Sequence, residues 1–368
     1  MSRKIAILLP TLAGGGVERL ALMLGEEFLG RGFDVEFVVC RDKGNLHDQI
    51  PTGASLVFLH APRARNILRP LIQYFREARP DSSLVSIWPL TWIAILARML
   101  SRSDTTLIVS EHSDLRHSST TGRHGRSLLR LLGKKVYGLA DRLVVVSSGV
   151  GKSLEQLCGL EGKDYTVINN PARRDDGIAL DDEDRELAQR WKATEHALIA
   201  IGNFKPAKDY PTLIRALAIA NQSSSLSLLI VGQGHGRAEV ERLARDHGIE
   251  DKVHIAGFRS DPFPLLREAD LLVLSSQWEG FGMVLVEAFR AGVNACSTDC
   301  PSGPAEVLAN GKYGVLAPVG DPEALASGIL EALANPLNAD LLRKRAIEFD
   351  PEKIAAQYLE YLCPHGQP

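Results

Sequence analysis

The sequence lacks the features that would place it at once in several large classes of protein. Its five cysteines are scattered along 368 residues with no zinc-site spacing, so we expect reduced thiols in a cytoplasmic setting. No run of about 18 apolar residues occurs, which argues against a membrane-spanning helix. The N-terminus runs from an apolar segment into glycines without a small-residue cleavage site, so we expect no secretory signal peptide.

An excess of charge of one sign is also missing. Acidic residues number 45 and basic residues 42, for a formal net charge of −3, and this balance does not indicate a nucleic-acid partner. The segment 116–135 reverses the sign locally, because it has no acid and contains Arg116, Arg123, Arg126, Arg130, Lys134 and Lys135. Leucines at 128, 129, 131 and 132 interleave with these bases. Two interpretations stay open: a solvated helix that packs its leucines inward, or an interfacial segment that rests on anionic lipid.

Short apolar runs alternate with helical patterns along most of the chain. Most runs are continuous and rich in β-branched residues, which is typical of parallel strands buried on both faces. We predict strands at 4–9, 34–40, 55–59, 84–88, 106–110, 142–147, 196–202, 226–232, 252–258 and 271–275. The strand–helix–strand order predicts an α/β fold with doubly wound parallel sheets.

The alternation pauses in the middle of the chain and then restarts. Asn170-Pro171 is followed by a polar, acidic stretch, so we predict a linker near 171–192. Asp350 before Pro351 is typical of a helix start. The predicted parts are an N-terminal Rossmann-like domain at 1–172, a C-terminal one at 173–350, and a final helix at 351–368 that packs back on the first. Ligands of such sheets bind beyond the carboxyl ends of the strands.

Two glycine-containing motifs fail as nucleotide sites. The segment 151–153 reads Gly-Lys-Ser, but a P-loop requires glycine where Val146 stands, so we predict an ordinary turn with a serine cap. The glycines of 232–236 follow a strand, but Arg237 takes the place of the last glycine of a dinucleotide fingerprint. A tight turn at which a ligand approaches the backbone stays open there.

The stretch WEGFGMVLVEAFRAG at 278–292 is a better candidate. Gly280 and Gly282 expose backbone N–H groups at a helix start, which is a natural phosphate site. Glu279 precedes that start, and Glu287 lies inside an apolar run, where an unpaired charge is costly. Carboxylates accept hydrogen bonds from paired sugar hydroxyls, so a sugar nucleotide suits the layout. The alternative is a pair of ordinary surface acids.

These residues, with a series of landmarks in order, resemble a retaining glycosyltransferase of the GT-B fold, family 4. Glu279 and Glu287 match its Glu-x7-Glu motif. The other landmarks are LAGGGVERL at 12–20, VINNP at 167–171, GFRSDPFPLLREADLLVLSS at 257–276, CPSGPAEVL at 300–308 and GVLAPVGDPEALA at 314–326. The resemblance covers nearly the whole chain and implies two Rossmann-like domains facing a cleft.

The resemblance also implies roles for individual residues. The catalytic set it implies is Glu279, His112 and Lys208, and the donor-binding set is Gly15, Gly16, Asn203, Lys205, Lys208, Gly234, Phe258, Arg259, Gly280, Phe281, Gly282, Met283, Val284 and Glu287. Asn203 departs from the family, which has an arginine there to clamp the diphosphate, and Lys205 is a candidate to supply the missing charge. Structural alternatives stay open: Lys208 as a surface lysine, His112 as a structural histidine and Phe258 as a core residue.

The implied reaction is retaining transfer of a hexosyl unit from a UDP- or GDP-linked sugar to an acceptor hydroxyl. The resemblance implies a front-face route in which the leaving phosphate takes the acceptor proton. No Asp-x-Asp metal motif stands out, so we expect neither metal nor other cofactor. A lipid-linked or saccharide acceptor fits polysaccharide biosynthesis, with 116–135 on an anionic membrane surface. The alternatives are another nucleotide-sugar enzyme, an epimerase or phosphorylase, and a non-catalytic binding subunit.

Overall fold

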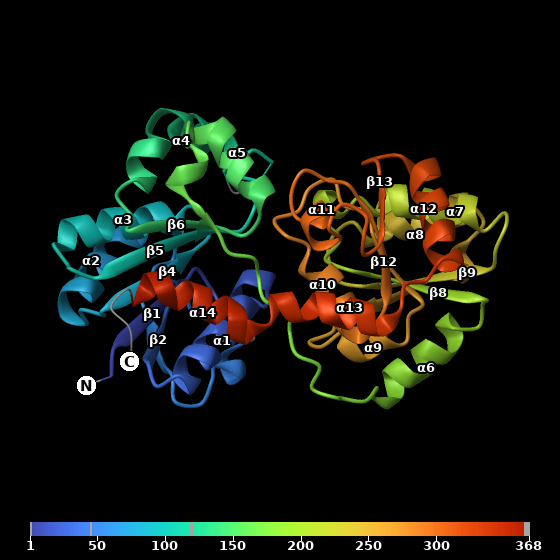
Figure 1. Ribbon diagram of the computed structural model, residues 1–368, viewed down its shortest axis with the longest axis horizontal. Helices are drawn as coiled ribbons and strands as arrows, with labels where there is room; N and C mark the ends of the chain where they lie inside the picture. The colour runs from blue at the N-terminus through green and yellow to red at the C-terminus, as the bar shows by residue number, and fades with distance from the viewer. Residues whose placement is uncertain (1, 45, 118–120, 364–368) are drawn as a thin grey trace. The chain divides into compact units, whose positions relative to one another are not determined.

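The computed structural model describes residues 2–44, 46–117 and 121–363, and they fold as two compact units (Figure 1). One unit holds the chain up to Pro171 and again from Asp350, and the other runs from Ala172 to Phe349. The sequence predicts these borders one residue later along the chain. No helix in the described ranges is long and apolar enough to cross a membrane.

The first unit is built on a seven-stranded sheet with the order β3-β2-β1-β4-β5-β6-β7. All neighbouring strands are parallel. The strands are β1 (Lys4–Leu9), β2 (Asp34–Val39), β3 (Ser55–Phe58), β4 (Ser82–Ser86), β5 (Thr106–Glu111), β6 (Arg142–Val145) and β7 (Thr166–Val167). Their core residues include Ile5, Ile7 and Phe37, which are almost fully buried, as predicted for strands covered on both faces.

Helices cover both faces of this sheet. They are α1 (Gly16–Gly30), α2 (Leu68–Glu77), α3 (Leu90–Ser101), α4 (Gly122–Tyr137), α5 (Ser148–Cys158) and α14 (Pro351–Leu362). Figure 1 shows α14 beside α1, and the buried Tyr358 hydroxyl of α14 lies 3.2 Å from Ser110 Oγ of β5. The final helix therefore completes the core of the unit that the chain forms first.

The second unit is built on a six-stranded sheet with the order β10-β9-β8-β11-β12-β13, again all parallel. Its strands are β8 (His196–Ile201), β9 (Leu226–Val231), β10 (Val253–Gly257), β11 (Leu271–Leu274), β12 (Asn294–Thr298) and β13 (Val315–Ala317). Its helices are α6 (Asp182–Trp191), α7 (Tyr210–Ala220), α8 (Arg237–Asp246), α9 (Phe263–Arg267), α10 (Met283–Ala291), α11 (Pro304–Val307), α12 (Pro322–Ala334) and α13 (Ala339–Ala346).

The structure corrects the sequence analysis at particular elements. The predicted strand 84–88 is β4 at Ser82–Ser86, because Ile87 takes a positive φ of 73° and turns the chain. Strand β12 reads NACST; its small and polar residues hid a strand whose residues 295–298 are fully buried. The short strands β7 and β13 were also missed.

The predicted linker at 171–192 is wrong over half its length, because α6 occupies its second half. The Asp181 carboxylate caps this helix by accepting from the Asp184 backbone N–H, 2.8 Å away. Trp191 at its end is fully buried, and its indole Nε1–H donates to the Leu198 carbonyl across 3.0 Å. One cap and one anchoring tryptophan therefore fix a helix whose composition is otherwise that of a solvated linker.

Candidate functional site

The loop between β11 and α10 carries the glycines that the sequence singled out. Gly282 has a φ of 85°, a left-handed conformation that glycine adopts without strain, and α10 starts at the next residue. Gly303 has a φ of 91° and packs so closely that a Cβ there would lie 2.1 Å from the Phe281 carbonyl oxygen. The Phe281 side chain is buried, with its ring 5.5 Å from that of Phe349. The Phe281 ring is therefore part of the core and is not available to a ligand.

Glu279, just before this turn, forms an ion pair with Lys208. Lys208 Nζ lies 2.6 Å from Glu279 Oε1, and the two side chains are 21% and 15% exposed. Ser276 Oγ donates to the same carboxylate oxygen across 2.7 Å. A cation and a carboxylate that are both mostly buried at the end of a parallel sheet can contact a charged and hydroxylated ligand together.

Backbone hydrogen bonds join the loops that carry these two side chains. The Gln277 N–H donates to the Ala207 carbonyl across 2.8 Å, and Ser275 Oγ donates to the Lys208 carbonyl across 2.7 Å. The stem of Lys208 crosses Gly202, where a Cβ would lie 2.7 Å from Lys208 Cε. Asp209 then caps α7 by accepting from the Thr212 N–H. The position of Lys208 is thus fixed before any ligand arrives.

The neighbouring residues of the predicted donor-binding set differ in how exposed they are. Asn203 and Lys205 are exposed on the loop after β8, and Asn203 Oδ1 accepts from the Gln233 N–H at 3.4 Å. Glu287 is partly buried on α10, about 6 Å along the helix from Met283 at about 1.5 Å per residue. The structure leaves Lys205 exposed near the position of the missing arginine.

The glycines of the turn at 232–236 are needed for packing within the protein. A Cβ at Gly232 would lie 2.0 Å from the Gly202 carbonyl oxygen, and one at Gly234 would lie 2.9 Å from that of Phe204. The close approach that these glycines allow is thus made by the loop after β8. Glycine here is required for packing, whether or not a ligand also borders the turn.

Phe258 and Arg259 follow β10 and differ in their exposure and contacts. Phe258 is 38% exposed, so its alternative interpretation as a core residue is wrong. Arg259 instead pairs with Asp184 at 2.8 Å and Glu183 at 2.5 Å on α6, and donates to the Ala256 carbonyl at 2.7 Å. An exposed ring on a loop tied down by an arginine is suited to stacking on a flat ligand.

In the first unit, Gly15 and Gly16 open α1 and are both exposed. The sequence analysis missed Glu18, whose buried carboxylate folds back so that Oε2 would lie 2.5 Å from a Cβ on Gly15. Thr11 Oγ1 donates to its other oxygen at 3.4 Å. A negative charge therefore already occupies the start of α1. The signal was an acid at the third position of a predicted helix.

His112 follows β5, and Glu111 ends that strand. Burial lowers the pKa of His112 to about 4, against a smaller opposing contribution from Asn170, so the imidazole is neutral near pH 7. Burial raises the pKa of the Glu111 carboxyl to about 7, although Thr91 Oγ1 and the Tyr137 hydroxyl donate to it at 2.7 and 2.8 Å. The histidine thus sits beside a buried acid that links β5 to α3 and α4.

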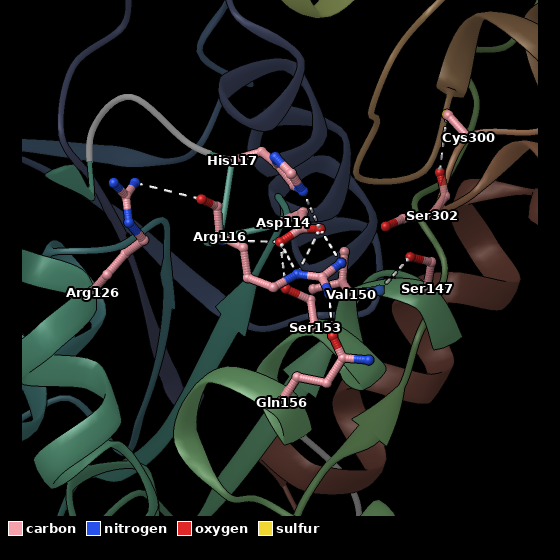
Figure 2. Close-up of polar contacts among 10 residues, drawn as sticks. All are labelled: Asp114, Arg116, His117, Arg126, Ser147, Val150, Ser153, Gln156, Cys300 and Ser302. Atoms are coloured by element: carbon pink, nitrogen blue, oxygen red, sulfur yellow. Dashed lines mark hydrogen bonds and ion pairs between the residues drawn. The ribbon is translucent and has the colours of Figure 1, made fainter. Parts of the chain in front are cut away.

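A second polar cluster, which the sequence did not suggest, holds the loop after β5 against α5 (Figure 2). The buried Asp114 accepts from Arg116 Nε at 3.0 Å and from Ser153 Oγ, and Arg116 also donates to Gln156. Burial raises the pKa of Asp114, but the hydrogen bonds from Arg116 and Ser153 outweigh it and hold that pKa below its usual value. Arg116 therefore stabilises the loop after β5, and its charge is not part of the exposed basic surface of the segment 116–135.

One leucine of helix α4 is buried and three are exposed. Leu129 is fully buried, but Leu128, Leu131 and Leu132 are 44%, 76% and 37% exposed. The interpretation that the leucines pack inward is wrong for these three. Most of the basic side chains of this helix are also exposed, and Lys134 pairs with Glu161 at 3.0 Å. The outward surface of α4 is therefore both apolar and basic. Residues 118–120 of the predicted segment lie outside the described residues.

Among the residues that the structure describes, no group of three or more His, Cys, Asp or Glu side chains is placed to hold a metal ion. The five cysteines are buried and free, and burial raises the pKa of Cys300, near Glu279, to about 12. The chemistry available at the strand ends of the second unit is therefore that of a lysine, carboxylates, a serine and helix-start N–H groups.

Comparison with known proteins identifies the class. Residues 182–349 match the family model for glycosyl transferases group 1, and residues 14–175 match the model for glycosyltransferase family 4. The chain belongs to the group 1 glycosyltransferases and has the GT-B fold, as the resemblance in its sequence implied. It is accordingly a glycosyltransferase.

Particular relatives are similar over nearly the whole chain. The N-acetylgalactosamine-N,N'-diacetylbacillosaminyl-diphospho-undecaprenol 4-alpha-N-acetylgalactosaminyltransferase of Campylobacter jejuni is 26% identical, covering 98% of this chain and 99% of the relative. The lipopolysaccharide 1,6-galactosyltransferase of Escherichia coli is 26% identical, covering 86% of each. Among solved structures, a glycosyltransferase from Rickettsia africae has a TM-score of 0.80 at 17% identity, covering 98% of each chain. Anabaena HepE, solved with UDP-glucose, has a TM-score of 0.79 at 20% identity over 98% and 99% of the two chains.

Proposed function

We propose that this glycosyltransferase moves a hexosyl unit from a nucleoside diphosphate sugar to an acceptor hydroxyl with retention of configuration. The observation that carries the proposal is the pair of Lys208 and Glu279, 2.6 Å apart beside the glycine start of α10. A lysine and helix-start N–H groups suit a diphosphate, and a carboxylate suits sugar hydroxyls. That a solved structure of similar fold contains UDP-glucose supports this donor class.

In the proposed reaction, the bond from the sugar C1 to the phosphate oxygen breaks and a bond from C1 to the acceptor oxygen forms. The acceptor proton passes to the departing phosphate on the same face, so no carboxylate nucleophile is needed. Lys208 and the N–H groups at the start of α10 stabilise the charge that develops on the leaving diphosphate. Glu279 holds donor-sugar hydroxyls, and Glu287 holds the ribose.

In the first unit, His112 is proposed to contact the transferred sugar as an uncharged imidazole. Its pKa of about 4 means that it accepts or donates hydrogen bonds at neutral pH without adding a positive charge. The proposal involves no metal and no other cofactor.

The proposed acceptor is a lipid-linked saccharide in polysaccharide assembly. The name of the Campylobacter relative specifies an undecaprenol-linked diphosphate acceptor, and that of the Escherichia relative specifies lipopolysaccharide. The exposed leucines and bases of α4 support a peripheral contact with anionic lipid on the cytoplasmic face. Such a contact would bring the first unit to an acceptor that cannot leave the membrane.

A release assay tests the proposal. Purified protein is incubated with UDP- and GDP-linked hexoses and a lipid-linked saccharide, and both free nucleoside diphosphate and glycosylated product are measured. We expect both products to appear in equal amounts from one donor. An epimerase would interconvert donors without nucleotide release, a phosphorylase would require phosphate, and a binding subunit would bind without turnover.

A further inference from the structure

Lys208 and Glu279 form an ion pair beside the start of α10. Glu279 Oε1 lies 2.6 Å from the ammonium and also accepts from Ser276 Oγ at 2.7 Å. Asn203 adds no charge at the place where the resemblance led us to expect a second cation. The principal fixed cation of the proposed diphosphate site therefore already has a counter-ion.

Packing and hydrogen bonds hold the backbone and stem of Lys208, which carry the ammonium to Glu279. Its stem lies across Gly202, its carbonyl accepts from Ser275 Oγ at 2.7 Å, and the preceding residue is bonded to Gln277. A phosphate that reaches Lys208 must therefore approach the Glu279 carboxylate as well. At this degree of burial two like charges are only partly screened by solvent.

The effect of the carboxylate depends on what the ligand carries. A carboxylate only accepts hydrogen bonds, so it gains two or more partners when hexose hydroxyls arrive with the phosphates. It gains none from a bare nucleoside diphosphate, which brings only repulsion and competition for Lys208. The same side chain thus favours the donor and opposes the product nucleotide.

We infer that Glu279 determines the preference of the site for the sugar nucleotide over the free nucleotide, by competing with the diphosphate for Lys208. The inference rests on the proposed function and deepens it. Once the sugar has been transferred, the ion pair re-forms as the nucleotide leaves. Glu279 therefore promotes product release in addition to holding the donor.

The test compares dissociation constants from isothermal titration with UDP, GDP and the donor that the release assay identifies. We expect Glu279→Gln to bind the nucleoside diphosphate about tenfold more tightly than the wild type, about 1.4 kcal/mol, and the donor more weakly. Glu279→Ala serves as a second replacement. Glu268→Gln is the matched control, since Glu268 forms a Lys–Glu pair of the same 2.6 Å length with Lys192 elsewhere in this unit. It should leave both constants unchanged.

A double-mutant cycle separates competition for Lys208 from general repulsion. In a Lys208→Gln background, Glu279→Gln should no longer improve nucleotide binding. Equal improvement in both backgrounds, or no improvement in folded Glu279→Gln and Glu279→Ala, overturns the inference and leaves the proposed function standing. If the wild type binds neither UDP nor GDP nor any sugar nucleotide, the proposed function fails, and this inference fails with it.

Discussion

The candidate residues of the two units differ in how firmly they are held. In the second unit, Lys208 and Glu279 lie on loops that are joined to each other by backbone and side-chain hydrogen bonds. In the first unit, Gly15 and Gly16 are exposed at a helix start, and α4 presents bare leucines to solvent. A site assembled before binding suits a small, invariant ligand such as a nucleotide, whereas an exposed surface suits an acceptor that is large and partly embedded in lipid.

The largest expected effect concerns the stability of the first unit. The pKa of Glu111 rises from 4.5 unfolded to about 7 folded, so its neutral form stabilises the fold below pH 4.5, and this stability is lost as the pH rises through 7. At about 1.4 kcal/mol per pKa unit, the loss is on the order of 3 kcal/mol. Relative to the wild type, Glu111→Gln should remove this loss from the free energy of unfolding that urea titrations measure between pH 4.5 and 7.

His112 contributes with the opposite sign over a largely overlapping pH range. Its pKa falls from 6.5 to about 4, so its stabilisation is present above pH 6.5 and is lost as the pH drops towards 4. Between pH 4.5 and 6.5 the two contributions oppose each other, so Glu111→Gln should reveal a rise in stability with pH that the wild type lacks. The same pH dependence of stability in Glu111→Gln and in the wild type would contradict the assignment.

The next largest effect is expected when the ammonium of Lys208 is removed from the second unit. Lys208→Ala removes a charge-assisted hydrogen bond to the diphosphate, and we expect the donor KM to rise roughly 30-fold, about 2 kcal/mol. Lys205→Ala is the matched control on the same loop, where we expect less than a threefold change. If Lys205→Ala has the larger effect, the exposed lysine has taken over from the arginine that Asn203 replaces, and the site is less preassembled than proposed.

Within the second unit, replacing Glu279 and Glu287 in turn should affect different kinetic constants. Glu279→Gln should lower kcat roughly tenfold, because a charged hydrogen bond to the sugar is lost in the transition state. Glu287→Gln should mainly raise the donor KM, because its proposed ribose contact is made equally in ground and transition states. Steady-state kinetics with the identified donor measure both. Wild-type constants in both variants would refute the site.

The smallest effect is expected on α4 of the first unit. Leu131→Ser should reduce co-sedimentation with anionic liposomes severalfold at low salt, because it removes the most exposed apolar contact, while Leu341→Ser on α13 of the other unit should not. Neutral liposomes should bind both variants and the wild type weakly. Equal, negligible binding of the wild type to neutral and anionic vesicles at low salt would instead favour a soluble acceptor.

The sequence by itself determined the class of this protein. Continuous apolar runs predicted buried parallel strands, and the spacing of Glu279 and Glu287 around a glycine turn, with its ordered landmarks, indicated the family. These features are local, because an apolar run and a glycine's backbone freedom can be read from a few consecutive residues. The β12 strand escaped because the strands that flank NACST come from elsewhere in the chain. The α6 helix escaped because its polar, acidic composition is that of a solvated linker, and only the Asp181 cap and the buried Trp191 fix it.

Only the tertiary structure decided which charges are paired. Lys208 and Glu279 are 71 positions apart in the chain, and no spacing rule predicts their 2.6 Å contact. The same holds for Arg259, which pairs with Asp184, and for the leucines of α4, whose outward direction depends on which face of the helix packs against α5 and α3. Pairing and exposure are set by the packing of segments remote in sequence, so they appear only once the sheets are assembled.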